Sequence, residues 1–97
     1  MARRAMRQDD NHGAVVTALR AMGATVHTIS QGGGIPDLLV GYKGKTALLE
    51  VKDGDKPPSA RKLTELEEKF FATWTGGPLF IVNSPEEAVA MIEAMVL

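Results

Sequence analysis

The sequence contains no cysteine and only two histidines, His12 and His27, among its 97 residues. The missing cysteines exclude disulfide bonds, a thiolate nucleophile and cysteine-type zinc sites, and two histidines argue against a histidine-based zinc site. No apolar run approaches the ~18 residues that a membrane span needs, and the beginning of the chain lacks the apolar core of a signal peptide. We therefore expect a cytoplasmic protein with no membrane partner.

The sequence also has no large excess of charge of one sign: its formal net charge is -1 at pH 7. This balance argues mildly against a protein that holds nucleic acid by bulk electrostatics. The charges are unevenly placed, however: every Lys and Arg lies at or before Lys69, whereas the residues after it hold three acids and no base. We expect nucleic-acid binding, where it occurs, to be weak and salt-sensitive.

The length and the 44% hydrophobic content fit a single domain spanning residues 1–97. A chain this short buries only about two thirds of its unfolded surface, so its stability is modest and dimerisation would help. Residues 1–8 form a basic N-terminal tail, which is either a disordered solubilising end or an arm that contacts DNA.

Helical and strand periodicities follow one another in the order αβββαβα, which predicts an α/β fold. A cap at residues 9–11 opens the first helix, a capping box of Thr64 and Glu67 opens the second, and Ser84 begins the third. The second and third strands form a hairpin, and a long connection then allows the strand at residues 79–82 to return parallel to the third. We expect a mixed four-stranded sheet flanked by helices.

Ionisable groups interrupt the two central strands, although charges inside a sheet need partners. Glu50 and Lys52 share one face of their strand, because side chains alternate along it. A two-residue loop at residues 43–44, or a four-residue loop at residues 42–45, places Asp37 opposite Glu50, whereas a three-residue loop does so only with a bulge. We predict an arrangement that places Asp37 on the face of Glu50.

Two carboxylates on one face repel each other and tend to become protonated unless a cation lies between them. Oxygen ligands suit a hard divalent ion that leaves room for a phosphate oxygen, and the Val51 carbonyl adds a further ligand. Lys52 could then hold an attacking water and offset negative charge in the transition state. The pattern therefore indicates metal-assisted hydrolysis of a phosphodiester, with Asp37, Glu50 and Lys52 as catalytic residues.

Residues 44–46, Gly-Lys-Thr, invite comparison with the end of a phosphate-binding P-loop. The glycine that this motif needs five residues earlier would fall at Leu39, and a strand rather than a helix follows. We therefore expect no nucleotide cofactor.

The pair Pro36–Asp37, followed after a spacer by Glu50–Lys52, resembles the PD-(D/E)XK nuclease signature. The wider string GGGIPDLLVGYKGKTALLEVKDGDKPPSARKLT is similar to small phage members of the virus-type replication-repair nuclease (VRR-NUC) family. The resemblance covers nearly the whole chain, from Arg7 to about Ile92.

This resemblance implies a restriction-endonuclease-like core in which Asp37, Glu50 and the Val51 carbonyl bind Mg2+ or Mn2+ and Lys52 is catalytic. It also implies a DNA substrate, branched or duplex, and a homodimer resembling Holliday-junction resolvases. If the chain is phage-encoded, its place is the cytoplasm of the bacterial host.

Two positions depart from what we expect of the family. The first helix commonly opens with an Asn-Gln pair, where this chain has Asn11 and His12, and the second often carries a glutamine where this chain has Glu68. The acid aligned near the first-helix start is Asp9, with Asp10 next to it. These five residues are candidates for contacts to water or substrate around the metal, although Asp9 and Asp10 also suit a helix cap and Glu68 a solvated surface.

Further candidates lie on both sides of the hairpin. Three successive glycines precede it and could let a DNA backbone approach, although a loop that needs unusual backbone angles explains them equally well. Three basic residues follow it and could contact phosphates, although a solvated face explains these too. The candidates for nucleic-acid binding are therefore Gly32, Gly33, Gly34, Lys56, Arg61 and Lys62.

Two helices show apolar stripes without candidate chemistry. In the second, the helical spacing of Leu66, Phe70, Phe71 and Trp74 predicts core positions. The last helix carries exposed methionines, which makes it a dimer element or a covering element.

The leading hypothesis is a metal-dependent DNA endonuclease. Two alternatives remain: a non-catalytic nucleic-acid-binding or phage assembly module that has kept the fold, and an internal ion-pair network of Asp37, Glu50 and Lys52.

Overall fold

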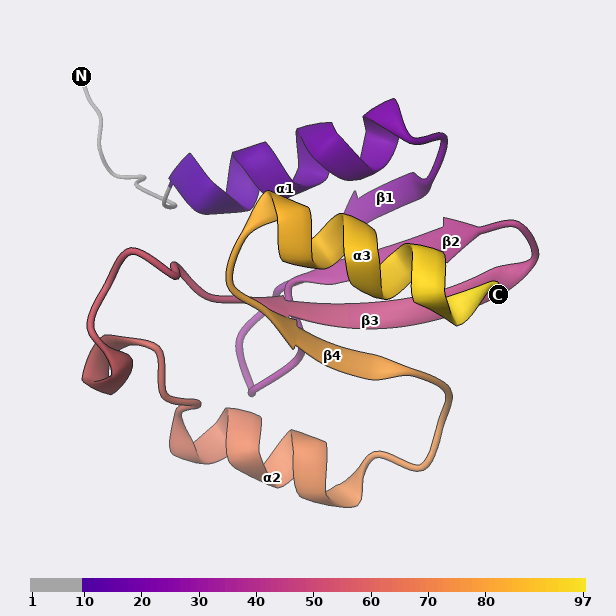
Figure 1. Ribbon diagram of the computed structural model, residues 1–97. Helices are drawn as coiled ribbons and strands as arrows, with labels where there is room; N and C mark the ends of the chain where they lie inside the picture. Colours follow the sequence, from indigo (N-terminus) through magenta and orange to yellow (C-terminus); the bar gives the residue numbers. More distant parts are fainter. Residues whose placement is uncertain (1–9) are drawn as a thin grey trace.

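Residues 10–97, which the computed structural model describes, fold in the predicted order, with a short 3-10 helix added before the second α-helix (Figure 1). The predicted basic tail and Asp9 lie outside the described residues, as does the side chain of Asp10. The elements are α1 (Asp10–Ala21), β1 (Thr25–Thr28), β2 (Leu38–Tyr42), β3 (Lys45–Val51), η2 (Pro58–Ala60), α2 (Glu65–Thr73), β4 (Leu79–Val82) and α3 (Pro85–Met95).

The strands form one four-stranded sheet in the order β1-β2-β3-β4. Strands β1, β2 and β3 pair antiparallel, and β4 lies parallel to β3 after the crossover through α2. The mixed sheet predicted from the sequence is therefore confirmed.

The β2–β3 hairpin has a two-residue loop of Lys43 and Gly44, because Tyr42 pairs with Lys45. Both loop residues have positive φ, 48° and 83°. This is the backbone conformation of a type I′ turn, whose twist matches that of the flanking strands. The turn therefore fixes the register of the two central strands.

The register determines which side chains share a face. Leu38 pairs with Leu49, and continuing one residue further puts Asp37 opposite Glu50. Val51 points to the other face, where it is buried in the core. The prediction that Asp37 and Glu50 share a face is confirmed.

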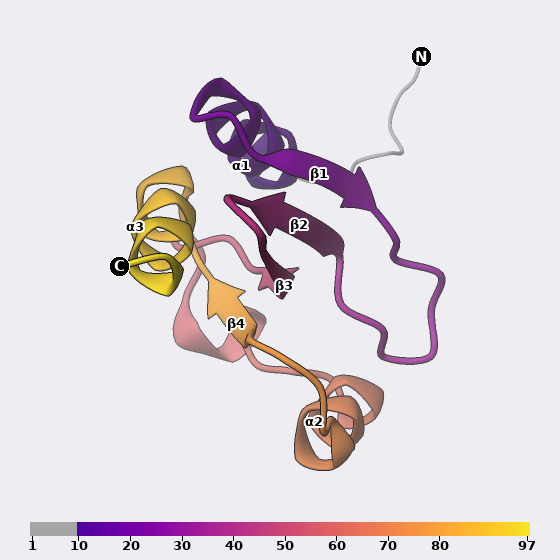
Figure 2. The ribbon, with the colours of Figure 1, turned by 90° about the vertical axis from the view of Figure 1, so that its right-hand side faces the viewer.

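Helices α1 and α3 cover one face of the sheet (Figure 2). They pack against each other and enclose the apolar side chains that point toward them. The largest fully buried residues of this core are Val15, Leu19, Pro36, Leu38, Val40, Leu49, Val82 and Ile92. The opposite face carries Glu50 and leaves Leu39 and Ile81 exposed, because neither α1 nor α3 covers it.

Helix α2 lies on the β4 side of the sheet, away from α1 (Figures 1 and 2). It begins with the predicted capping box of Thr64 and Glu67, but none of its residues is buried. Leu66 is 55% exposed and Trp74, stacked on Phe70, is 40% exposed. The prediction that its apolar stripe is core is therefore wrong for the described chain, because the sheet face beside the helix is itself left open.

Helix α3 is a covering element. Ala88 and Ile92 are fully buried, and Met91 and Met95, which we expected to be exposed, are partly buried against the core. No helix within residues 10–97 is long and apolar enough to cross a membrane.

At Gly34, the loop before β2 packs against the start of α2. Its φ is +84°, and a Cβ added there would meet the backbone carbonyl of Leu66 at less than van der Waals distance. Gly33 also has a positive φ, +68°, but a Cβ there would meet nothing within 4 Å. The absence of a side chain at Gly34 thus allows the start of α2 to lie against the loop that leads to Asp37.

The substitution Gly34→Ala should destabilise the protein far more than Gly33→Ala. Backbone strain alone costs about 1–2 kcal/mol for a left-handed alanine, and at Gly34 the clash with a backbone carbonyl adds to it, for a total of about 3 kcal/mol or more. Urea unfolding of both variants measures the difference. Equal losses at the two positions would contradict this account of how α2 is held.

Candidate active site

Three of the predicted residues meet at the open face of the sheet. Glu50 lies near the end of β3, Lys52 directly follows that strand, and Asp37 lies immediately before β2. The Val51 N–H donates a hydrogen bond of 2.8 Å to Oδ2 of Asp37. The backbone of β3 therefore holds the Asp37 carboxylate beside Glu50.

The carbonyl of Val51 lies on the same side of β3 as its N–H, because both backbone groups of a strand residue point toward one neighbouring strand. On that side, β2 begins only at Leu38, so the carbonyl faces the region of the Asp37 side chain. By contrast, the Lys52 N–H points to β4 and donates to Val82 O at 2.9 Å. The predicted carbonyl ligand is thus directed toward the predicted carboxylate ligand.

Glu50 is a buried acid, only 3% exposed. Burial raises the pKa of its carboxyl to about 8, and the negative charges of Asp37 and Glu67 add to the rise. Its Oε1 has no hydrogen-bond partner among the described residues. Buried oxygens are rarely left in this state, so the carboxyl of Glu50 needs either a proton or a cation.

Lys52 lies between two carboxylates. Its Nζ is 3.5 Å from Oε2 of Glu50 and 2.9 Å from Oε1 of Glu67. Burial works against the charged amine, but the hydrogen bond to Glu67 and the two negative charges outweigh it and raise the pKa of Lys52. The amine is therefore protonated at neutral pH.

Glu67 is the residue of this site that the sequence reasoning missed. Burial works against its charge, but the hydrogen bonds from the Thr64 N–H and from Lys52 outweigh it and lower the pKa of the Glu67 carboxyl. The capping box marked Glu67 as a helix-start residue, but no local signal indicated its contact with Lys52. Glu68, for which the sequence left open a solvated surface or a place beside the site, is exposed.

The donor atoms near Glu50 fit a hard divalent cation. Two carboxylates and one carbonyl are oxygen ligands, and Glu50 has a buried oxygen without a partner. Within residues 10–97, no group of three or more His, Asp or Glu side chains is arranged to hold a metal ion by itself. A metal at Asp37 and Glu50 would therefore depend on the Val51 carbonyl and on water for its remaining ligands, as Mg2+ sites commonly do.

Asn11 connects the start of α1 by hydrogen bonds to the backbone that follows β3 and β4. Its Nδ2 donates to Lys52 O at 2.5 Å and to Asn83 O at 3.2 Å. This places Asn11 behind the site, on backbone carbonyls rather than on the carboxylates. His12 is partly buried, and its predicted contact to water or substrate remains a prediction, as do those of Asp9 and Asp10.

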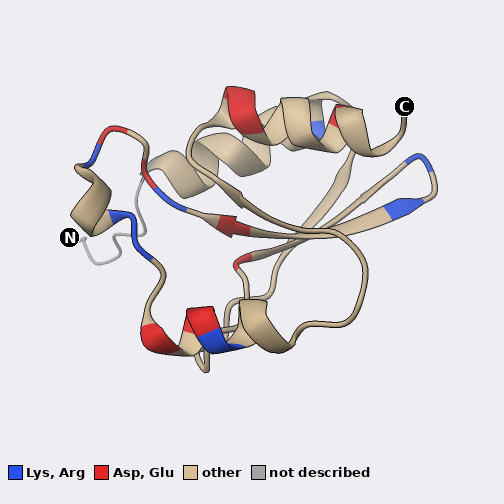
Figure 3. Cartoon of the chain, turned by 60° about the horizontal axis from the view of Figure 1, so that its bottom comes forward, with Lys and Arg blue, Asp and Glu red and all other residues tan. Residues whose placement is uncertain are grey.

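The candidates for nucleic-acid binding lie around the site rather than in it. Gly32 and Gly33 are exposed, whereas Gly34 packs on α2. Lys56 and Lys62 are exposed in the chain between β3 and α2, where Figure 3 shows basic and acidic segments alternating. Arg61 donates from Nε to Lys56 O at 2.8 Å and lines a polar cleft that also contains four acids, Asp53, Asp55, Glu86 and Glu87. A role in phosphate contact remains a prediction for all six.

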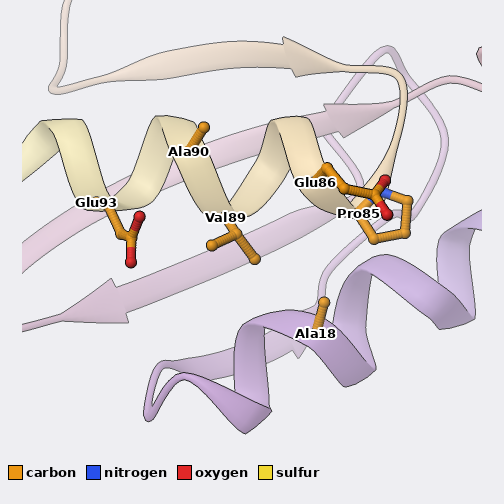
Figure 4. A pocket seen from close by; sticks show the side chains of 6 residues that line it. All are labelled: Ala18, Pro85, Glu86, Val89, Ala90 and Glu93. Carbon is orange, nitrogen blue, oxygen red and sulfur yellow. The ribbon is translucent and has the colours of Figure 1, made fainter.

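A separate hollow of about 350 Å³ lies between α1 and α3. Figure 4 shows it lined by Ala18, Pro85, Glu86, Val89, Ala90 and Glu93. It is on the helical side of the sheet, opposite the face of Glu50 and Lys52, and therefore has no part in this site.

No family model matches the sequence, and no curated protein matches it. Among solved structures, one described as a VRR_NUC domain is similar to this chain, with 31% sequence identity and a TM-score of 0.55. The match covers 84% of this chain and 89% of the other.

A mixed sheet whose central hairpin brings Asp37, Glu50 and Lys52 to one face defines a nuclease-type α/β domain with a restriction-endonuclease-like core. The chain belongs to the VRR-NUC domain family. The family and the fold indicated by the sequence are thus confirmed.

The raised pKa of Glu50 predicts a pH-dependent stability without metal. Because the folded-state pKa of Glu50, about 8, exceeds the ordinary value of 4.5, the contribution of Glu50 to stability is full below about pH 4.5 and is lost as the pH rises through about 8, by at most about 1.4 kcal/mol per pH unit. Glu50→Gln removes this loss. Urea unfolding in EDTA from pH 5 to 8.5 should therefore show the variant gaining stability relative to wild type as the pH rises, and a pH-independent difference would contradict the prediction.

Proposed function

We propose that this VRR-NUC domain is a metal-dependent endonuclease that hydrolyses phosphodiester bonds in DNA. The observation that carries the proposal is the buried Glu50 beside Asp37 and Lys52, on the sheet face that α1 and α3 do not cover, with one oxygen that has no partner among residues 10–97. A buried acid with a strongly raised pKa and specific charged neighbours is typical of a functional site.

Asp37, Glu50 and the Val51 carbonyl would hold Mg2+ or Mn2+. When bound, such an ion polarises a phosphoryl oxygen and lowers the pKa of water. The carboxylates must be ionised to act as ligands, so the cation removes the cost that burial places on the charged form of Glu50. The hydrogen bond from Val51 to Asp37 holds the second ligand in place.

Lys52 would act on the reacting groups themselves. Its protonated amine lies within 3.5 Å of Glu50, so it can hold an attacking water and stabilise the negative charge that develops on the phosphate oxygens. A preorganised donor of this kind contributes about 100-fold or more to rate.

DNA would approach the site from the loop before β2 and the chain that follows β3. Gly32 and Gly33 are exposed close to Asp37 in sequence, and Lys56 and Lys62 are exposed after β3. These groups could contact the phosphates on either side of the scissile bond. Since contacts of this kind are electrostatic and the chain has a net charge of -1, we expect binding to be weak and salt-sensitive.

We further propose that the domain acts as a homodimer on branched DNA such as a Holliday junction. Leu39 and Ile81 on the open sheet face, with Leu66 and Trp74 of α2, are exposed large apolar residues. Such surfaces commonly mark interaction sites, and a second copy could cover them. Two active sites in one assembly would suit cutting two strands.

The ion pairs of Lys52 also favour a second candidate, a network that is purely structural. Both carboxylates at Lys52 are paired in the described residues, so charge compensation alone accounts for part of the arrangement. It accounts for Oε1 of Glu50, which has no partner among the described residues, only if that carboxyl is protonated.

Metal binding separates the two candidates. A cation that binds only the folded protein raises the melting temperature as its concentration increases. We expect Mg2+ at millimolar concentration to stabilise the wild type at pH 8, and Asp37→Ala and Glu50→Gln to abolish the shift. An unchanged melting temperature in the wild type would favour the structural network.

Cleavage assays test the reaction and its residues. With labelled four-way junctions, flaps and linear duplexes, the wild type should cleave in Mg2+ or Mn2+ and not in EDTA, and Asp37→Ala should be inactive. Lys52→Ala should lower kcat by about 100-fold or more while keeping the Mg2+-dependent rise in melting temperature. Lys45→Ala, which removes an exposed lysine from the same strand, is the matched control and should cleave normally.

The same samples also test the substrate preference and the oligomeric state. Preference for the junction over the duplex supports the branched substrate, and sedimentation of the same sample gives the oligomeric state. DNA binding without cleavage in any metal would instead favour a non-catalytic nucleic-acid-binding or phage assembly module.

A further inference from the structure

The amine of Lys52 is shared between an acid of its own strand and an acid of a distant helix. Glu50 lies 3.5 Å from Nζ, whereas Glu67, from the first turn of α2, lies 2.9 Å from it. The shorter contact is a charge-assisted hydrogen bond, the stronger of the two kinds of interaction. Glu67 is therefore the main partner of Lys52 in the described chain.

Oε1 of Glu67 is itself fixed by the backbone. It accepts the Thr64 N–H at 2.9 Å, while the Glu67 N–H donates to Oγ1 of Thr64 at 3.2 Å. These two bonds form the capping box of α2. The same oxygen of Glu67 thus accepts one hydrogen bond in the helix cap and another from the amine of Lys52.

The start of α2 is also fixed relative to Asp37. Gly34, three residues before Asp37, lies so close to the Leu66 carbonyl that no side chain fits between them. The loop leading to Asp37 therefore lies against the start of α2, from which Glu67 reaches the amine of Lys52.

We propose that Glu67 is a positioning residue that holds the Lys52 amine at the reacting phosphate. The inference rests on the proposed function, in which Glu50 gives its oxygens to a cation and can no longer hold the amine. Among the described residues Glu67 then remains as the carboxylate bonded to Lys52. The side chains of Lys52 and Glu67 are 13% and 17% exposed, so little water competes for this bond.

The other explanation is that Glu67 serves only its helix cap. A pair of substitutions separates the two. Thr64→Ala removes the hydroxyl half of the capping box and leaves the bond between Glu67 and Lys52, whereas Glu67→Ala removes the carboxylate half of the box together with the bond to Lys52. The loss of a cap destabilises by about 1 kcal/mol in either variant. Glu67→Gln keeps an oxygen that can accept from both Thr64 and Lys52.

The first measurement is the kinetics of DNA cleavage in Mg2+. Glu67→Ala should lower kcat by about tenfold or more with little change in KM, since a displaced catalytic group affects the chemical step. Thr64→Ala should keep the wild-type kcat, and Glu67→Gln should recover most of it. Equal values of kcat in Glu67→Ala and Thr64→Ala, in a wild type that cleaves, would overturn the positioning role and leave the nuclease proposal standing.

The second measurement needs no activity. Amine acylation by an activated ester in EDTA, mapped by mass spectrometry, reports how freely Lys52 reacts, with exposed Lys45 as the internal reference. We expect Glu67→Ala to raise the rate at Lys52 several-fold, and Thr64→Ala to leave it unchanged. A raised rate in a protein that cleaves no DNA would support the contact and refute the proposed function, whereas an unchanged rate in Glu67→Ala would overturn the contact.

Discussion

The pairing register of β2 and β3 is the constraint on which the site depends. With the loop limited to Lys43 and Gly44, Asp37 falls opposite Glu50. A slip of one residue would turn Asp37 toward the helices, because the side-chain period of a strand is two. The buried Leu38 opposes such a slip, since it would move from the core to the open face while Leu49 kept its place in the core. Core packing and site geometry are therefore specified by the same set of backbone hydrogen bonds.

This arrangement has a cost in stability. Glu50 is held out of water next to two other acids, and burial together with those charges raises its pKa to about 8. A small domain with few large apolar residues has little stability to spare. The cost is lowered by the Lys52 amine, which lies between Glu50 and Glu67. A divalent cation would lower it further, so the features that weaken the metal-free protein are those that favour binding of a metal.

The parts of the structure that could be predicted from the sequence are those set by local pattern. The hairpin follows from two apolar runs around Lys43 and Gly44, and the shared face of Glu50 and Lys52 follows from strand alternation. The exposure of α2 could not be predicted in this way. Helical spacing indicates an apolar stripe, but whether a neighbour covers it depends on tertiary packing, and Trp74 remains 40% exposed.

Glu67 shows that tertiary packing also limits what the sequence can predict for a single side chain. Its place in the capping box is local and was recognised, and that role alone explains its position in the sequence. Its second role arises because Gly34 allows the start of α2 to approach the loop before Asp37, which brings Glu67 within 2.9 Å of Lys52. A residue already explained by local structure can thus belong to the site as well. Because Glu67 belongs both to the first turn of α2 and to the site, changes at the site and changes in the helix should not be independent.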